Sequence, residues 1–236
     1  SCFIFLALMP VLGVTASLGE ALSGFANKTL FFVLSSFMLA DAFKAVPITK
    51  RVLIGLLKKF GKNVSSMLFA LMAVTLLFSS VISNVPVCAI FMAIGLSLLD
   101  LYDEEAAKKS AGRAIMIGVS VATMIGGIIT PAGSSINILA LNLLEEQTGT
   151  TVTFMQWMLA GIPIAVVALP FAWFVIAKIY KPANFRPEMV EKFINNQDVP
   201  KKLTRDEIKV LAVTGVMLVL WIASSWVPAI DVTVVS

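Results

Sequence analysis

The sequence predicts an all-α integral membrane protein. Of its 236 residues, 58% are hydrophobic, and the mean hydropathy of +0.94 is too high for a soluble domain. A bilayer core about 30 Å thick takes roughly 20 helical residues. Two of the uncharged segments are longer than one crossing needs and are interrupted by polar residues. We therefore do not expect either of them to be an uninterrupted transmembrane helix. The uncharged segments lie at 29–40, 63–99, 114–144, 154–177 and 210–230.

The longest uncharged segment, 63–99, has a polar break near its middle. Its 37 residues are too many for one crossing. The 21 residues of 63–83 could cross, but the 14 residues of 86–99 form only about 21 Å of helix. These lengths predict a re-entrant helical hairpin with Ser83-Asn84-Val85-Pro86 at its tip. Such a tip is tolerated at membrane depth only inside protein or beside a wet cavity, so its polar groups are candidates for binding.

The segment 114–144 also exceeds one crossing, and it is interrupted by small and polar residues from Gly126 to Asn137. Pro131 lacks a backbone donor and Gly133 permits unusual dihedral angles, so we expect the helix to unwind there. This predicts a broken transmembrane helix whose free carbonyl groups can coordinate a cation and whose half-helix N-terminus can face an anion. A simple proline kink is the alternative interpretation.

Basic residues predict the orientation of the hairpin. Of the 18 Lys and Arg residues, 17 lie in 44–62, 101–113 and 178–209. A re-entrant hairpin puts these three segments on one side of the membrane, whereas a single crossing would split them six against eleven. The positive-inside tendency therefore favours the hairpin and places its open end in the cytoplasm.

The rest of the chain divides around these two breaks. Residues 1–18 resemble part of a span, and 29–46 and 154–177 are further spans, with Asp41 and Lys44 forming a local pair. Apolar and basic residues alternate at helical spacing over 48–60, which predicts an interfacial helix near anionic lipid; a solvated helix packed on the protein is the alternative. Residues 182–204 form a polar cytoplasmic linker.

The polar residues of the two breaks limit the chemistry. The chain has no histidine, and Cys2 and Cys88 lack metal-ligand spacing, so a His-based relay, a transition-metal site and a Ser–His nucleophile are excluded. Neutral Ser and Asn oxygens suit Na⁺, and their donors suit a carboxylate. Ser79 precedes Ser83 by four residues, so we expect both on one helix face.

Three stretches resemble the divalent anion:sodium symporters, which include dicarboxylate and citrate transporters. Ser83-Asn84-Val85 is similar to the family's Ser-Asn-Thr motif at the tip of its cytoplasmic hairpin, with Val in place of Thr. Residues 125–137 resemble the family's Gly-Thr-Pro-x-Asn break, although Ser134-Ser135 stands where the family has Thr-Pro. Residues 20–27 resemble the segment before the family's interfacial helix, and 154–161 and 203–226 continue the likeness.

The resemblance implies an inverted-repeat secondary transporter. Residues 1–181 would be the first repeat and 205–236 the first span of a truncated second repeat, so we expect the chain to be a fragment holding half of the transport site. The resemblance also implies a homodimer in a bacterial inner membrane and no nucleic-acid partner. It implies a sodium site and a substrate site that share residues: Ser79, Ser83, Asn84 and Gly133 for Na⁺, and Ser83, Asn84 and Val85 for the dianion.

We therefore expect sodium-coupled transport of a dicarboxylate such as succinate, or of citrate, by alternating access. Na⁺ is the coupling ion and no organic cofactor is expected. The alternative within transport is a sodium-independent exchanger or a proton-coupled carrier of sulfate, organic acids or arsenite. Outside transport, an assembly subunit without its own transport role remains open, while an intramembrane hydrolase is disfavoured because no lysine lies at membrane depth.

Overall fold

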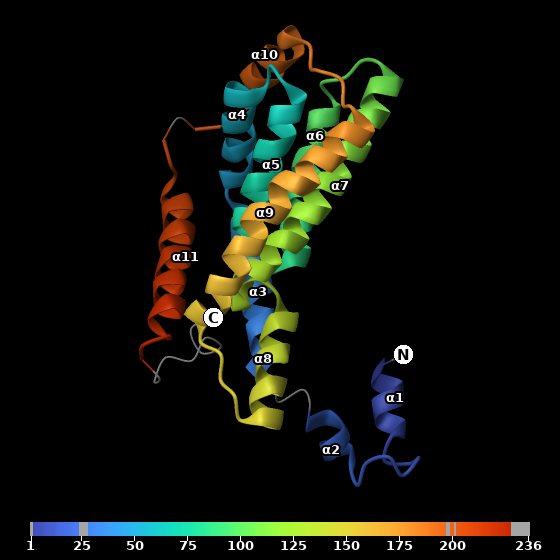
Figure 1. Cartoon of the computed structure of the whole chain (residues 1–236), viewed down its shortest axis with the longest axis vertical. Coiled ribbons are helices and arrows are strands. Elements are labelled where there is room, and N and C mark those ends of the chain that lie inside the picture. Colours follow the sequence, from blue (N-terminus) through green and yellow to red (C-terminus); the bar gives the residue numbers. More distant parts are fainter. Residues whose placement is uncertain (1, 24–27, 197–198, 201, 228–236) are drawn as a thin grey trace.

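The computed structural model describes residues 2–23, 28–196, 199–200 and 202–227 (Figure 1). All regular elements of these residues are helical, which confirms the predicted all-α class. The residues 24–27 of the first family-like stretch, and 228–236 of the final predicted span, lie outside this description. The helices are α1 (Cys2–Leu8), α2 (Leu18–Leu22), α3 (Lys28–Ala45), α4 (Ile48–Phe60), α5 (Val64–Ser79), α6 (Asn84–Leu99), α7 (Glu105–Ile129), the 3-10 turn η2 (Pro131–Gly133), α8 (Ser135–Thr148), α9 (Phe154–Tyr180), α10 (Pro187–Asn195) and α11 (Arg205–Ala223).

Two of the described helices, α7 and α9, are long and apolar enough to cross a bilayer by length and composition. Helix α9 begins at a capping box in which Thr153 and Gln156 satisfy each other's backbone N–H groups. Helices α5 and α6 have 16 residues each, about 24 Å of helix, which is shorter than a bilayer core.

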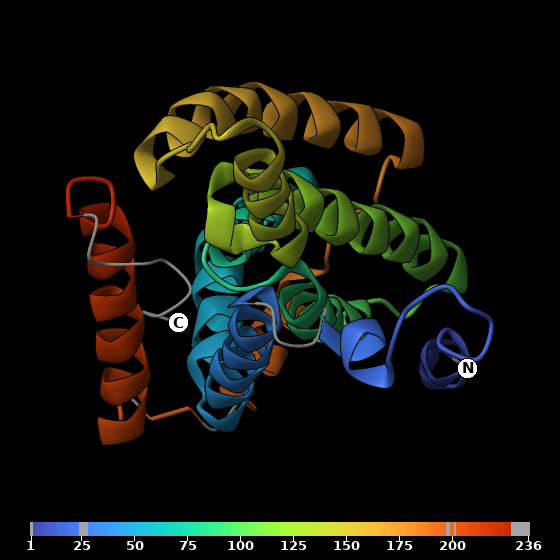
Figure 2. The same cartoon turned by 90° about the horizontal axis from the view of Figure 1, so that it is seen from below.

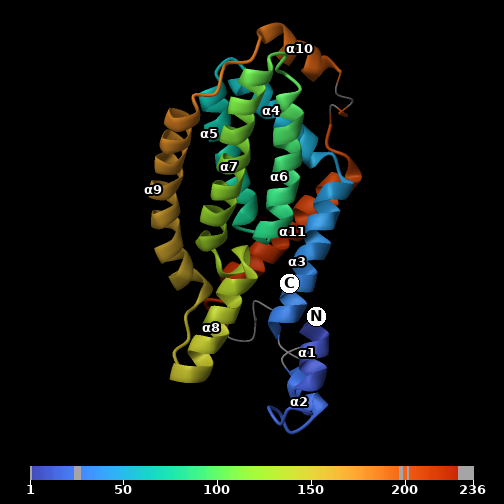
Figure 3. The same cartoon turned by 90° about the vertical axis from the view of Figure 1, so that its right-hand side faces the viewer.

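Helices α5 and α6 lie side by side and run antiparallel, joined by a turn at residues 80–83, here called the α5–α6 turn (Figures 1 and 3). Their open ends lie at the end of the molecule where α7 begins, α9 ends and α10 packs near α4. The α5–α6 turn lies about half-way along the molecule, level with the C-terminus of α7. The three segments rich in Lys and Arg therefore lie together at one end of the molecule.

Helix α7 packs against α5, α6 and α9 and forms the middle of the core. Phe78 of α5 makes edge-to-face contacts with Phe43 and Phe91, at centroid distances of 5.5 and 5.3 Å, and so joins α3, α5 and α6. The Trp173 indole of α9 donates a hydrogen bond to the Ser65 carbonyl at 2.8 Å. These contacts join α5 and α6 to each other, to α3 and to α9.

Between α7 and α8 the chain leaves α-helical geometry at residues 130–134, here called the α7–α8 break. Thr130 and Ser134 have extended dihedral angles on either side of η2. Helix α8 then continues away from the bundle (Figure 3). The break lies directly against the α5–α6 turn, because the Thr130 hydroxyl donates a hydrogen bond to the Ser80 carbonyl.

Outside the core, Asp41 and Lys44 form the predicted local pair, with 3.1 Å between Oδ1 and Nζ. Helix α11 lies at the side of the bundle, opposite α1 and α2 (Figure 2). Its first turn is tied to α4 because the Arg51 guanidinium donates to both carboxylate oxygens of Glu207, at 2.5 and 3.0 Å. The interfacial position of α4 stays a prediction.

Candidate functional site

Glycines at the end of α7 and in the α7–α8 break let these segments approach the end of α5 and the start of α6 at van der Waals distance. A Cβ atom on Gly126 would lie 2.9 Å from the Ser79 Cβ, and one on Gly127 would lie 2.5 Å from the Asn84 Nδ2. A Cβ on Gly133 would lie 3.0 Å from the Ser79 carbonyl oxygen. No larger residue fits these positions without a shift, so glycine here serves close approach.

The Asn84 side chain lies in the middle of this contact. In one amide orientation its Oδ1 accepts a hydrogen bond from the Ser79 hydroxyl at 2.7 Å. In the other orientation its Nδ2 donates to the Ser79 Oγ at 2.7 Å, the Thr123 carbonyl at 3.2 Å and the Gly133 carbonyl at 3.0 Å. Only the hydrogen-bond partners of an amide group distinguish its oxygen from its nitrogen. The three surrounding oxygens favour the second orientation, in which the Asn84 amide nitrogen lies among them.

With the amide oxygen turned inward, four oxygens converge: Ser79 Oγ, Asn84 Oδ1, Thr123 O and Gly133 O, here called the oxygen cluster. Its only donor in that orientation is the Ser79 hydroxyl. Four neutral oxygens, two of them main-chain carbonyls beside an unwound helix, form a donor set that fits a hard monovalent cation. With the amide nitrogen turned inward instead, the N–H groups satisfy the same carbonyls without a cation.

Thr130 and Asn137 hold the α7–α8 break in shape. The Thr130 hydroxyl donates to the Ser80 carbonyl at 2.5 Å and accepts from the Gly133 N–H at 3.0 Å, so it joins the break to the α5–α6 turn. The Asn137 Nδ2 donates to the Gly127 carbonyl at 2.7 Å and the Thr130 carbonyl at 3.0 Å. Sequence reasoning gave neither residue a role in the site, although both belong to the polar interruption of an apolar helix.

Two helix N-termini begin beside the oxygen cluster. Neither the Ser83 side chain at α6 nor the Ser134 side chain at α8 caps its helix. The first N–H groups of a helix have no intrahelical partner, and they attract anions through the helix dipole. Next to them, Val85 and Ile136 are 70% and 72% exposed. The surface beside the cluster therefore combines free backbone donors with uncharged side chains.

The structure brings three of the predicted site residues together and leaves two at the edge. Ser79, Asn84 and Gly133 meet in the oxygen cluster. Ser83 and Val85 lie at the start of α6 and make no side-chain hydrogen bond to the cluster among the described residues. The expectation that Ser79 and Ser83 share a helix face is wrong, because α5 ends at Ser79 and Ser83 is the last residue of the α5–α6 turn. The Thr123 carbonyl is a contact that sequence reasoning missed.

Comparison with known proteins identifies the family. The family described as the sodium:sulfate symporter transmembrane region matches residues 1–236. The chain belongs to the divalent anion:sodium symporter family. This membership confirms the resemblance and makes the chain part of an integral membrane transporter, not of an enzyme.

Relatives of this chain include two proteins named sodium-dependent dicarboxylate transporter SdcS. The one from Staphylococcus saprophyticus is 25% identical over 228 residues, which are 94% of this chain and 43% of that protein. The one from Staphylococcus aureus (strain USA300) is 26% identical over 175 residues, 71% of this chain and 34% of that protein. A protein of Cupriavidus necator named only "Membrane protein" is 25% identical over 175 residues, 73% of this chain and 33% of that protein. The chain thus spans less than half the length of these relatives.

Proposed function

We propose that the protein containing this chain couples Na⁺ to the transport of a small divalent anion by alternating access. The observation that carries the proposal is the oxygen cluster, in which Ser79, Asn84 and Gly133 meet although they come from three separate segments. A Na⁺ ion in the cluster replaces the donor N–H of Asn84 as the partner of the two carbonyl oxygens. Moving each such charge down 100 mV contributes about 2.3 kcal/mol to transport.

The substrate carboxylate, in this proposal, lies against the start of α6. Ser83 and Asn84 supply polar groups there, the free N–H groups of the first turn supply donors, and Val85 supplies an apolar wall. The second uncapped N-terminus, at α8, follows Gly133 by two residues and adds a second positive helix end. A dicarboxylate is the proposed substrate because two relatives are named for that specificity.

The placement in the membrane is part of the same proposal. Helices α5 and α6 form the re-entrant hairpin, with open ends on the basic, cytoplasmic side, and α7 with α8 forms the broken span. Helix α4 lies in the interface, residues 182–204 form a cytoplasmic linker, and 205–236 begin the second repeat. The proposed assembly is a homodimer in the bacterial inner membrane. The gathering of basic segments at one end of the bundle supports this placement.

Uptake of labelled succinate by proteoliposomes of the full-length protein tests the proposal. We expect uptake to require an inward Na⁺ gradient, to stop when K⁺ replaces Na⁺, and to be lost in Asn84→Ala and Ser79→Ala. Ser120→Ala is the matched control, since that α7 hydroxyl bonds only within its own helix, to Met116 O at 2.9 Å. Unchanged uptake by Asn84→Ala, or equal uptake in K⁺, would refute the proposal.

Sulfate is a second candidate substrate, because the matching family is described by sodium:sulfate symport. Sulfate also presents oxygens to the N–H groups at the start of α6, without needing a second carboxylate site. Competition of unlabelled sulfate against labelled succinate decides between the two. Counter-transport in the absence of any Na⁺ gradient would instead identify the sodium-independent exchanger.

A further inference from the structure

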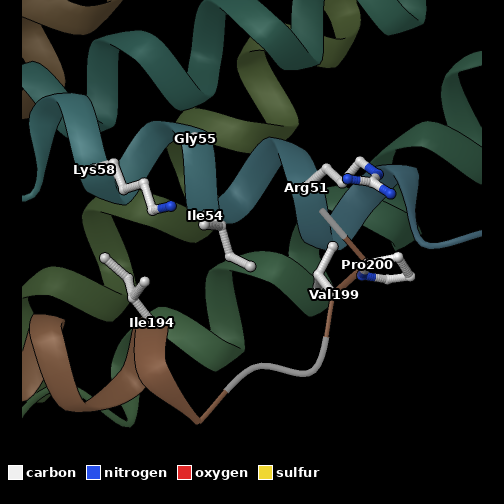
Figure 4. A pocket seen from close by; sticks show the side chains of 7 residues that line it. All are labelled: Arg51, Ile54, Gly55, Lys58, Ile194, Val199 and Pro200. Carbon is white, nitrogen blue, oxygen red and sulfur yellow. The ribbon is translucent and has the colours of Figure 1, made fainter. Parts of the chain in front are cut away.

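A hollow of about 410 Å³ lies between α4 and the chain that follows α10, remote from the oxygen cluster (Figure 4). Lys58 and Arg51 lie towards its two ends, with Ile54 between them (Figure 4). Its lining thus has cations at both ends and apolar groups in the middle. The lining residues are Arg51, Ile54, Gly55, Lys58, Ile194, Val199 and Pro200.

The floor of the hollow is one stripe of α4. Arg51, Ile54, Gly55 and Lys58 follow the spacing i, i+3, i+4 and i+7, so they lie on the same helix face. Seven residues of helix separate the two cationic positions by about 10.5 Å. The opposite face of α4, with Leu53 and other apolar residues, is buried in the core. The stripe is therefore separate from the packing that holds α4 in place.

Both cationic groups have donors to spare. The Arg51 Nε and Nη2 groups bond to Glu207 and to the Lys202 carbonyl, which leaves the two N–H donors of Nη1 without a hydrogen bond among the described residues. Lys58 is exposed and forms no ion pair with any described carboxylate. A phosphate is an anion that a guanidinium and an ammonium group both bind well.

Gly55 keeps the middle of the stripe open. No atom lies within 4 Å of the position that a Cβ atom would take on this residue. Glycine inside a helix is unfavourable relative to alanine, and here neither packing nor a positive φ requires it. A side chain at this position would instead project into the hollow. The glycine thus preserves a shallow apolar floor between the two cations.

We propose that this hollow binds an anionic phospholipid. The phosphate lies against the Lys58 ammonium at one end of the hollow, and the start of an acyl chain covers Ile54 and Ile194. The apolar floor distinguishes this ligand from a soluble dianion, which has no group to place there. Helix α4 lies at the basic end of the bundle, where anionic headgroups gather at a membrane surface. The inference rests on the interfacial position of α4 and is independent of what the protein transports.

Native mass spectrometry of the detergent-solubilised full-length protein, titrated with dioleoyl phosphatidylglycerol, tests the proposal. We expect Lys58→Gln to weaken binding of this lipid about fivefold, the effect of one basic residue at a lipid surface. Lys59→Gln is the matched control, because it removes the same charge from the neighbouring exposed residue outside the hollow. We expect Lys59→Gln to change binding less than twofold.

A second pair of variants tests the shape of the hollow without changing any charge. Gly55→Leu fills the floor and should abolish the preference for phosphatidylglycerol over phosphatidylcholine. Gly215→Leu is its control, since Gly215 of α11 also has open space around its Cβ position. Equal losses in Lys58→Gln and Lys59→Gln, unchanged binding in Gly55→Leu, or displacement of the lipid by millimolar inorganic phosphate would each overturn the proposal.

Discussion

Replacing Gly127 by alanine adds a single carbon atom, the Cβ, beside the proposed sodium site. The new Cβ would lie 2.5 Å from the Asn84 Nδ2 and 2.7 Å from the Asn84 Cγ, both far inside van der Waals contact. The group that must move is the end of the Asn84 side chain, and not the backbone of α6. We therefore expect the amide to leave the oxygen cluster while the helices keep their packing.

The size of the effect follows from these contacts. Overpacking of a core position destabilises a protein by about 1–3 kcal/mol. The displaced side chain can rotate, so we expect a loss of folding stability at the lower end of that range. If the same energy is instead required of the Na⁺-bound state, in which Asn84 must return to the cluster, apparent Na⁺ affinity falls about fivefold.

The assay is the Na⁺ concentration dependence of succinate uptake, with thermal unfolding of the purified full-length protein as a parallel measurement. Gly112→Ala is the matched control on the same helix, because its Cβ would meet only the flexible end of Leu99, at 3.3 Å. In the Asn84→Ala background the clash is absent, so Gly127→Ala should add no further loss of stability. Wild-type Na⁺ dependence in Gly127→Ala would refute the assignment of Asn84 to the cluster.

Two further substitutions test the surroundings of the cluster. Asn137→Ala removes the donors to the Gly127 and Thr130 carbonyls, and we expect a loss of about 1–3 kcal/mol in unfolding free energy, measured by denaturant titration; an unchanged midpoint would show that the α7–α8 break holds its shape without this side chain. Val85→Thr adds a hydroxyl at a 70% exposed position, so stability should stay constant while the ratio of succinate to sulfate uptake changes several-fold; an unchanged ratio would remove Val85 from the substrate site.

The two polar interruptions could be found in the sequence because Ser, Asn, Gly and Pro residues stand out within otherwise apolar segments. Pro131 and Gly133 predict a loss of helical geometry, and η2 with its extended neighbours occupies those residues. The pairing of Asp41 with Lys44 was also predictable, since it depends only on helical spacing. Such features are local in the chain.

Contacts between segments could not be predicted from residue spacing. The contact of Asn84 with the Thr123 and Gly133 carbonyls depends on how closely α5, α6 and α7 approach one another. The glycines permit this approach, but their presence in the sequence does not identify the residues that meet. Helix α7 also begins at Glu105, nine residues before the uncharged segment, because charge marks the expected edge of a membrane and not the edge of a helix. Lysine and arginine are good helix formers.

The two orientations of the Asn84 amide provide a physical mechanism for the proposed coupling between Na⁺ binding and anion binding. Without a cation, its N–H groups satisfy the carbonyls of α7 and the break, so the cluster needs no ion to stay packed. In the proposed Na⁺-bound state, the oxygen turns inward, and a positive charge is added beside the first N–H groups of α6. An anion at that helix end then gains attraction to the ion, and by linkage the anion strengthens Na⁺ binding by the same factor. Two neutral segments can thus bind a cation and a dianion together, although neither carries a charged side chain.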